Sequence, residues 1–179
     1  MTQPVALGER IVSLSAFNSA IIGPALDLLP RGMDSERARV LMLAIGLQES
    51  RLTHRRQLVG NPPKPTGPAT GLWQFERGGG CAGVLTHEAS QDLMRWACRV
   101  CKAKPTPYSL WRALQWDDIL AAAAARLLLF TDPHTLPSIT DPGAAWECYI
   151  RVWRPGKPHP ASWGALHAQA LAAVEAAQA

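Results

Sequence analysis

The sequence predicts a mainly α-helical protein built as one domain over residues 1–179. Most segments place apolar residues three and four positions apart, which is the spacing of a helix with one buried face. Proline, glycine and helix-capping residues separate these segments. A chain of 179 residues with 47% hydrophobic content is large enough for one well-buried core and short for two.

The first third of the chain is expected to form three helices. Residues 7–29 have mostly helical spacing interrupted by Gly23 and Pro24, which predicts two short helices meeting at a kink. Asp34 or Ser35 would cap the next helix, whose apolar face leads to Glu49.

An irregular region follows this helix. Residues 54–70 contain four prolines and two glycines, so we expect a loop or the first arm of an irregular β-hairpin. Residues 72–76 would be the returning strand. The three glycines at 78–80 would let the backbone turn tightly or approach a ligand.

The second half is predicted to be nearly all helical. The expected helices cover residues 86–101, 108–116, 117–130, 141–153 and 162–176. The third of these contains an alanine run that is apolar on all sides, which indicates a central helix.

Charge and composition limit the partners. The net charge of +4 is spread along the chain, which suits an anionic polymer or surface. The seven tryptophans are not interleaved with lysine or arginine, so a nucleic-acid partner is not expected. No apolar run is long enough to cross a membrane and the N-terminus does not read as a signal peptide, so we expect synthesis in a cytoplasm.

The four cysteines do not predict a metal site or a secreted disulfide framework. Cys98 and Cys101 have the spacing of a zinc or redox pair, but they lie within a predicted helix and no second pair accompanies them. Two buried thiols are the favoured interpretation. No cofactor is expected.

Glu49 is the first candidate for chemistry. It follows eight nearly uninterrupted apolar or small residues, which places a carboxyl group at the edge of the core. Burial and the negative end of the helix dipole would both favour its protonated form. The alternative is an exposed glutamate at a helix end.

Two motifs carry a resemblance to a known family. Glu49-Ser50-Arg51-Leu52 after an apolar helix, followed by Gly-Leu-Trp-Gln-Phe at residues 71–75, resembles the paired motifs of the lysozyme-like lytic transglycosylases, with the closer likeness to small members encoded by tailed bacteriophages. The resemblance implies the goose-type lysozyme fold, with a small β-hairpin beside the catalytic helix. It also implies cleavage of the β-1,4 MurNAc-GlcNAc bond of peptidoglycan.

The resemblance assigns roles to individual residues. Glu49 would be the acid and base, and Glu76, at the end of the second motif, would be a second carboxylate across the cleft. Ser50 and Gln74 would orient the acid or the sugar, and Trp73 would be either core or a stacking face for a sugar ring. The family's third motif has only a loose counterpart at residues 145–156, where Tyr149 would take the place of its tyrosine. The remaining acids are interpreted as helix caps or polar-face residues, namely Asp92, Asp117, Asp118, Asp132, Asp141 and Glu147.

These roles leave three functions open. A lytic transglycosylase needs only Glu49, whereas a muramidase hydrolase would need Glu49 and Glu76. A virion structural or ejection protein would keep the fold with little activity. The expected partners are peptidoglycan glycan strands and other phage virion proteins. The expected site of action is the cell wall, reached in the virion or by release at lysis.

Overall fold

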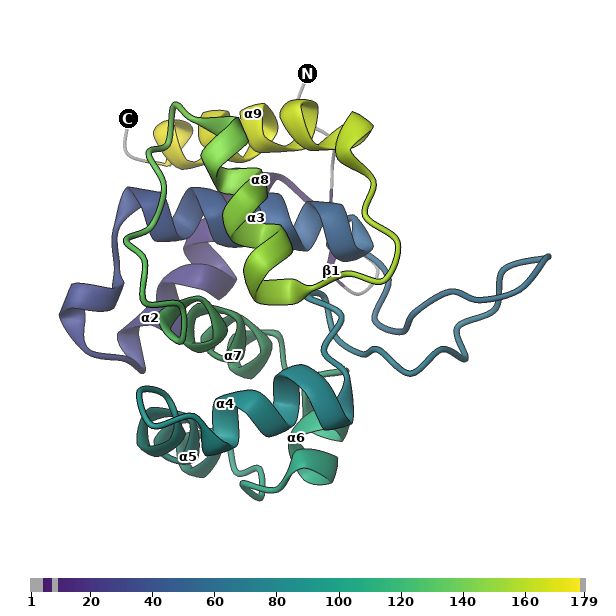
Figure 1. The fold of residues 1–179 in the computed structure, drawn as a ribbon, viewed down its shortest axis with the longest axis vertical. Helices are drawn as coiled ribbons and strands as arrows, with labels where there is room; N and C mark the ends of the chain where they lie inside the picture. Colours follow the sequence, from purple (N-terminus) through teal and green to yellow (C-terminus); the bar gives the residue numbers. More distant parts are fainter. Residues whose placement is uncertain (1–4, 8–9, 178–179) are drawn as a thin grey trace.

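The computed structural model describes residues 5–7 and 10–177, and helix α3 (Glu36–Ser50) lies at the centre of it (Figure 1). The Oγ of Ser35 accepts a hydrogen bond from the backbone N–H of Ala38, so Ser35 caps this helix as predicted. Every residue from Val40 to Leu47 is buried. The helix ends where Arg51 adopts a left-handed conformation with φ of 59°.

Residues before α3 differ from the prediction. Strands β1 (Val5–Leu7) and β2 (Arg10–Val12) pair antiparallel, and residues 8–9 lie outside the described part of the chain. Helices α1 (Leu14–Phe17), η1 (Asn18–Ile22) and α2 (Gly23–Asp27) follow without interruption. The two short helices predicted around Gly23 and Pro24 are thus joined by a π-type turn. The N–H of Gly23 bonds to the carbonyl of Asn18, and this wide π-type turn accommodates a proline that has no N–H to donate.

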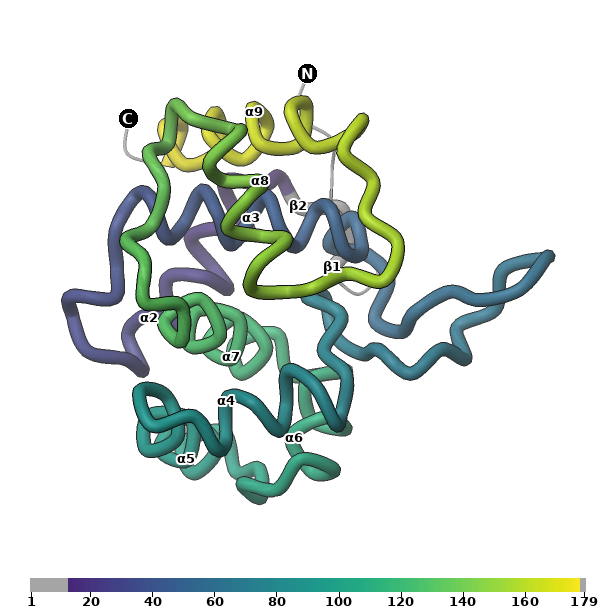
Figure 2. Tube along the Cα trace, viewed as in Figure 1, coloured from purple at the N-terminus to yellow at the C-terminus, as the bar shows by residue number. Residues whose placement is uncertain are grey.

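The predicted β-hairpin is reduced to isolated bridges. Arg56 pairs with Thr70, Val59 with Lys64, and Thr70 with Phe75. The arm containing the first two bridges projects from the body of the molecule (Figure 2). The strand expected over residues 72–76 is wrong, because Gly71 and Gln74 both have positive φ and the chain turns between them.

The glycine run forms a helical turn instead of a loop. It lies in η3 (Arg77–Cys81), which continues into α4 (Ala82–Thr86). Gly80 is needed there, since a Cβ atom would come within 2.7 Å of the Phe75 ring. Helix α5 spans Gln91–Val100, so the single helix predicted over residues 86–101 is wrong in its first part, where the chain turns after Thr86.

The later helices are confirmed with small shifts at their ends. They are α6 (Pro107–Ala113), α7 (Asp118–Phe130), α8 (Pro142–Trp153) and α9 (Pro160–Ala176). Asp117 and Asp141 cap α7 and α8 through their side chains. The alanines of α7 are buried, and α7 packs against α2, α3 and α5 as a central helix. Helix α9 packs along α3, and α8 packs against α9 (Figure 1).

The cysteines do not form disulfides in the described residues. Cys81, Cys98 and Cys148 are buried and Cys101 is half-buried, and all four are free thiols. Within residues 5–7 and 10–177, no cluster of histidine, cysteine and acidic side chains has the arrangement of a metal site. No helix in this part of the chain combines the length and apolar character needed to span a bilayer.

Candidate active site

A groove of about 1360 Å³ brings the end of α3 together with segments from the whole length of the chain. Gln48 and Glu49 line it from α3. Its other walls come from residues 57–60 of the projecting arm, the turn leading to Glu76, the loop after α7, and α8 with the loop that follows it. The groove therefore lies where the sequence motifs converge.

Glu49 is held in this groove as a weak acid. Its carboxyl group is half-buried, and burial raises its pKa from 4.5 to about 7, against the opposing effect of a hydrogen bond from Tyr149. The Tyr149 hydroxyl donates to Oε1 of Glu49 over 2.7 Å. Near neutral pH a substantial fraction of Glu49 is therefore protonated, as a general acid requires.

Tyr149 is fixed by an aromatic cluster behind it. The Tyr149 ring stacks on Trp163 with centroids 5.3 Å apart and also contacts Trp146. Burial, together with the neighbouring Glu49 carboxyl, holds the pKa of Tyr149 above its usual range. The phenol therefore stays protonated and can serve as a hydrogen-bond donor to Glu49.

Glu76 and Gln74 also line the groove. Glu76 is exposed and directly precedes η3, where its side chain makes no capping hydrogen bond. Gln74 is half-buried, and its Nε2 donates to the carbonyls of Gly71 and His54 over 2.8 and 3.2 Å. The turn thus presents one ordered amide and one exposed carboxylate to the groove.

Ser50 and Trp73 do not line the groove, and of the two alternatives for Trp73 the structure shows the core residue. Ser50 is buried, and its Oγ donates to the carbonyl of Leu72 over 2.6 Å. Trp73 is fully buried, and its Nε1 donates to the carbonyl of Met42 over 2.8 Å. Both side chains attach the turn at residues 71–74 to helix α3, so they position the site from behind.

Asp132 is a groove residue that sequence reasoning assigned to caps and polar faces. Its side chain is only 4% exposed and binds Arg151 over 2.6 Å and His134 over 2.7 Å. Although burial alone would raise it, hydrogen bonds from Arg151 and His134 hold the pKa of Asp132 at about 2. Asp132 also lines the groove with both partners. The sequence around Asp132 does not predict this site, since Arg151 lies far along the chain on α8.

Trp153 is a second groove residue without an assigned role from the sequence. Its Nε1 donates to the carbonyl of Trp73 over 3.0 Å, and its ring meets Phe75 edge to face at 6.1 Å. It therefore joins the end of α8 to the turn after α3.

Comparison of the chain with models of known protein families, with characterised proteins and with solved structures finds no match in any of the three.

Proposed function

We propose that this chain has a lysozyme-like fold and cleaves peptidoglycan glycan strands at the β-1,4 MurNAc-GlcNAc bond as a lytic transglycosylase. The observation that carries the proposal is the half-buried Glu49, with a pKa of about 7, at the wall of a groove large enough for several sugar residues. The paired motifs at Glu49 and at residues 71–75 support the same assignment.

The proposed reaction uses Glu49 twice. Protonated Glu49 donates its proton to the glycosidic oxygen as the bond from C1 to that oxygen breaks. The 6-hydroxyl of the same muramic sugar then bonds to C1 and returns its proton to the Glu49 carboxylate. The products are a 1,6-anhydro end and a free 4-hydroxyl, and the enzyme is restored.

Tyr149 would hold the acid in place during this cycle. Its hydroxyl donates to Oε1 of Glu49, which leaves the other carboxyl oxygen for proton transfer. The same donor stabilises the carboxylate after the first proton transfer. A burial-raised pKa and one hydrogen-bond donor thus serve both the acid and the base step.

A muramidase hydrolase is the second candidate, because Glu76 lines the same groove as Glu49. An ionised second carboxylate would activate a water or attack C1. The proposed setting is a phage-encoded protein that is made in the host cytoplasm and acts at the cell wall.

Clearing of cell-wall suspensions by Glu49→Gln tests the proposal. We expect a loss of about a thousandfold, because glutamine cannot donate a proton to the leaving oxygen. Glu147→Gln is the matched control, since Glu147 is exposed on α8 outside the groove. If Glu49→Gln clears walls as fast as the parent, the chain is not a glycosidase and a structural role is favoured.

A further inference from the structure

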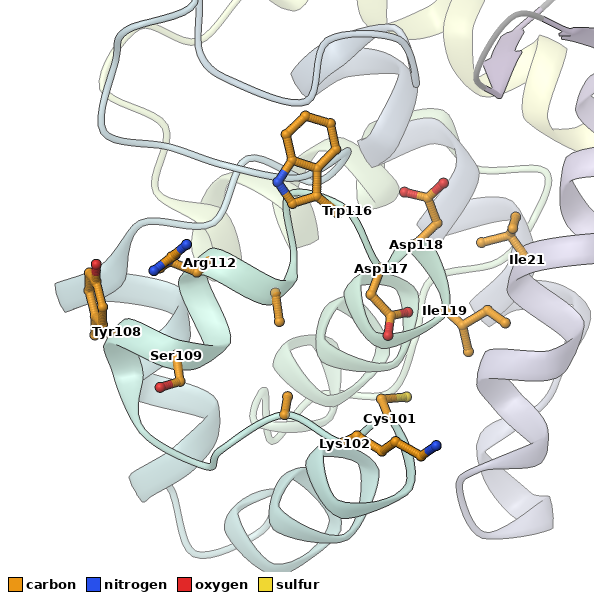
Figure 3. A pocket seen from close by; sticks show the side chains of 12 residues that line it. Ile21, Cys101, Lys102, Tyr108, Ser109, Arg112, Trp116, Asp117, Asp118 and Ile119 are labelled. Atoms are coloured by element: carbon orange, nitrogen blue, oxygen red, sulfur yellow. The ribbon is translucent and has the colours of Figure 1, made fainter.

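A second hollow of about 750 Å³ lies apart from the groove and shares none of its lining residues (Figure 3). It is formed by α6, the start of α7, the segment after α5 and Ile21. In the view of Figure 3, Tyr108 and Arg112 lie on one side, Asp117 and Asp118 on the other, and Trp116 between them.

Two large aromatic side chains are exposed at this hollow. Trp116 is 72% exposed and Tyr108 is 51% exposed. A tryptophan is costly to leave in water, and Trp116 has the largest exposed fraction among the large hydrophobic side chains described. The Arg112 guanidinium lies 5.9 Å from the centroid of the Tyr108 ring, and that ring stacks on Trp111 with centroids 6.3 Å apart.

The lining carries charged side chains of both signs. Lys102 and Arg112 are the cations of the lining, and Asp117 and Asp118 are its carboxylates. Asp118 is already bound by Arg55, with Nη2 2.6 Å from Oδ2, and Asp117 caps α7. Within the described residues neither Lys102 nor Arg112 forms an ion pair.

The polar groups and rings of the lining bear on the class of ligand. A nucleic acid binds through a row of cations along its phosphates, and Lys102 and Arg112 are the only cations among the lining residues described, with Asp117 beside them. A sugar has an apolar ring face that packs on an aromatic side chain, and hydroxyls that need both donors and acceptors. Cations, carboxylates and the Ser109 hydroxyl supply both kinds of group.

We propose that the hollow around Trp116 and Tyr108 is a second carbohydrate-binding site, which holds a glycan strand at a distance from the bond that Glu49 cleaves. This inference rests on the proposed function for its ligand, a β-1,4-linked strand of N-acetylated sugars. The strand bound there keeps the enzyme on insoluble wall material between cleavage events.

The test measures binding in the Glu49→Gln background, so that the strands stay intact. Co-sedimentation with purified peptidoglycan sacculi is compared for Trp116→Ala and for Trp96→Ala. Trp96 is the matched control, because it is 49% exposed on α5 beside Arg99 and lines neither cavity. We expect Trp116→Ala to weaken binding about five- to tenfold and Trp96→Ala to leave it unchanged.

A soluble probe identifies the ligand class. We expect an N-acetylglucosamine tetramer to shift the indole N–H resonance of Trp116, and single-stranded DNA to leave it in place. A shift with DNA alone, an equal loss of sacculus binding in both tryptophan variants, or no loss with Trp116→Ala would overturn the inference.

The outcome is separable from that of the proposed function. With Glu49 intact, Trp116→Ala should slow cleavage of sacculi but not of soluble glycan fragments. If Trp116 binds sugar while Glu49→Gln still clears walls, the binding site stands and the glycosidase assignment fails. If Glu49→Gln abolishes clearing while Trp116→Ala binds sacculi normally, the glycosidase assignment stands and the second binding site fails.

Discussion

The hydroxyl of Tyr149 donates a hydrogen bond to Oε1 of Glu49, and this 2.7 Å contact joins residues 100 positions apart. Glu49 ends a buried helix and Tyr149 lies on α8, so the contact exists only in the folded protein. Burial disfavours the charged form of Glu49, whereas the phenol favours it. These two opposing effects together set the pKa of Glu49.

Tyr149→Phe should move the basic limb of the pH–activity profile to higher pH. The phenol stabilises ionised Glu49, so its loss leaves burial unopposed and raises the pKa of Glu49 further. Activity at pH 6 should fall about tenfold, because the acid loses its anchor. Rates of wall clearing from pH 5 to 9 measure both effects. Glu147→Gln, which lies outside both cavities, is the control, and a limb that moves to lower pH would contradict the assignment.

The burial of Glu49 should also make folding stability depend on pH. Its pKa is higher in the folded chain, at about 7, than the ordinary 4.5, so the folded state binds more protons between these values. The resulting stabilisation of the folded state is fully present below pH 4.5 and is lost as the pH rises through 7.

Glu49→Gln removes that dependence. The free energy of unfolding of the parent, relative to this variant, should fall by about 2 to 3 kcal/mol between pH 4.5 and 8.5. Urea unfolding at the two pH values measures the difference. Glu147 is exposed, so the free energy of unfolding of Glu147→Gln should follow that of the parent at both pH values. A difference in this free energy between parent and Glu49→Gln that stays the same at both pH values would show that the Glu49 carboxyl is well solvated.

The sequence predicted Glu49 for a physical reason that the structure retains. A carboxyl group at the end of a buried helix has little access to water, and that much follows from a local pattern. Most of the helices were predictable in the same way, since caps and apolar spacing are local. Tyr149 was found only through a loose motif, because its contact with Glu49 spans distant elements.

What the motifs could not predict is the direction of each side chain. Trp73 and Ser50 belong to the motifs, but a motif does not say which way a residue points. Gly46 leaves room on α3, where a Cβ atom would come within 2.3 Å of the Leu52 side chain and 3.2 Å of the Trp73 indole nitrogen. Trp73 therefore packs inward on α3. Asp132 had no predicted role in the groove, because Arg151, which binds it together with His134, lies far along the chain on α8.

Asp132→Asn should destabilise the chain at pH 7 by about 1 to 2 kcal/mol, since the exposure of Arg151 weakens the ion pair. The pKa of Asp132 is lowered from 3.8 to about 2 in the folded chain. Its ionised form therefore stabilises the folded state above pH 3.8, and this stabilisation is lost as the pH falls through 2. The difference in stability between parent and variant should therefore narrow in acid. Urea unfolding of parent and variant at pH 7 and pH 2.5 measures this difference. Asp92→Asn is the control, because it removes an exposed ion pair with Arg95 on one helix. Equal losses at both pH values would point to packing instead of charge.

Glu76→Gln separates the two glycosidase mechanisms. Glu76 is an exposed carboxylate on the groove wall, and the single-carboxylate mechanism does not use it for proton transfer. We therefore expect the variant to keep its rate of wall clearing within about tenfold of the parent, while Glu49→Gln loses nearly all of it. Mass spectrometry of the released muropeptides should find 1,6-anhydro ends for both the parent and Glu76→Gln. Reducing-end sugars alone from the parent, with a loss in Glu76→Gln as large as in Glu49→Gln, would instead assign a hydrolase in which Glu76 is the second carboxylate.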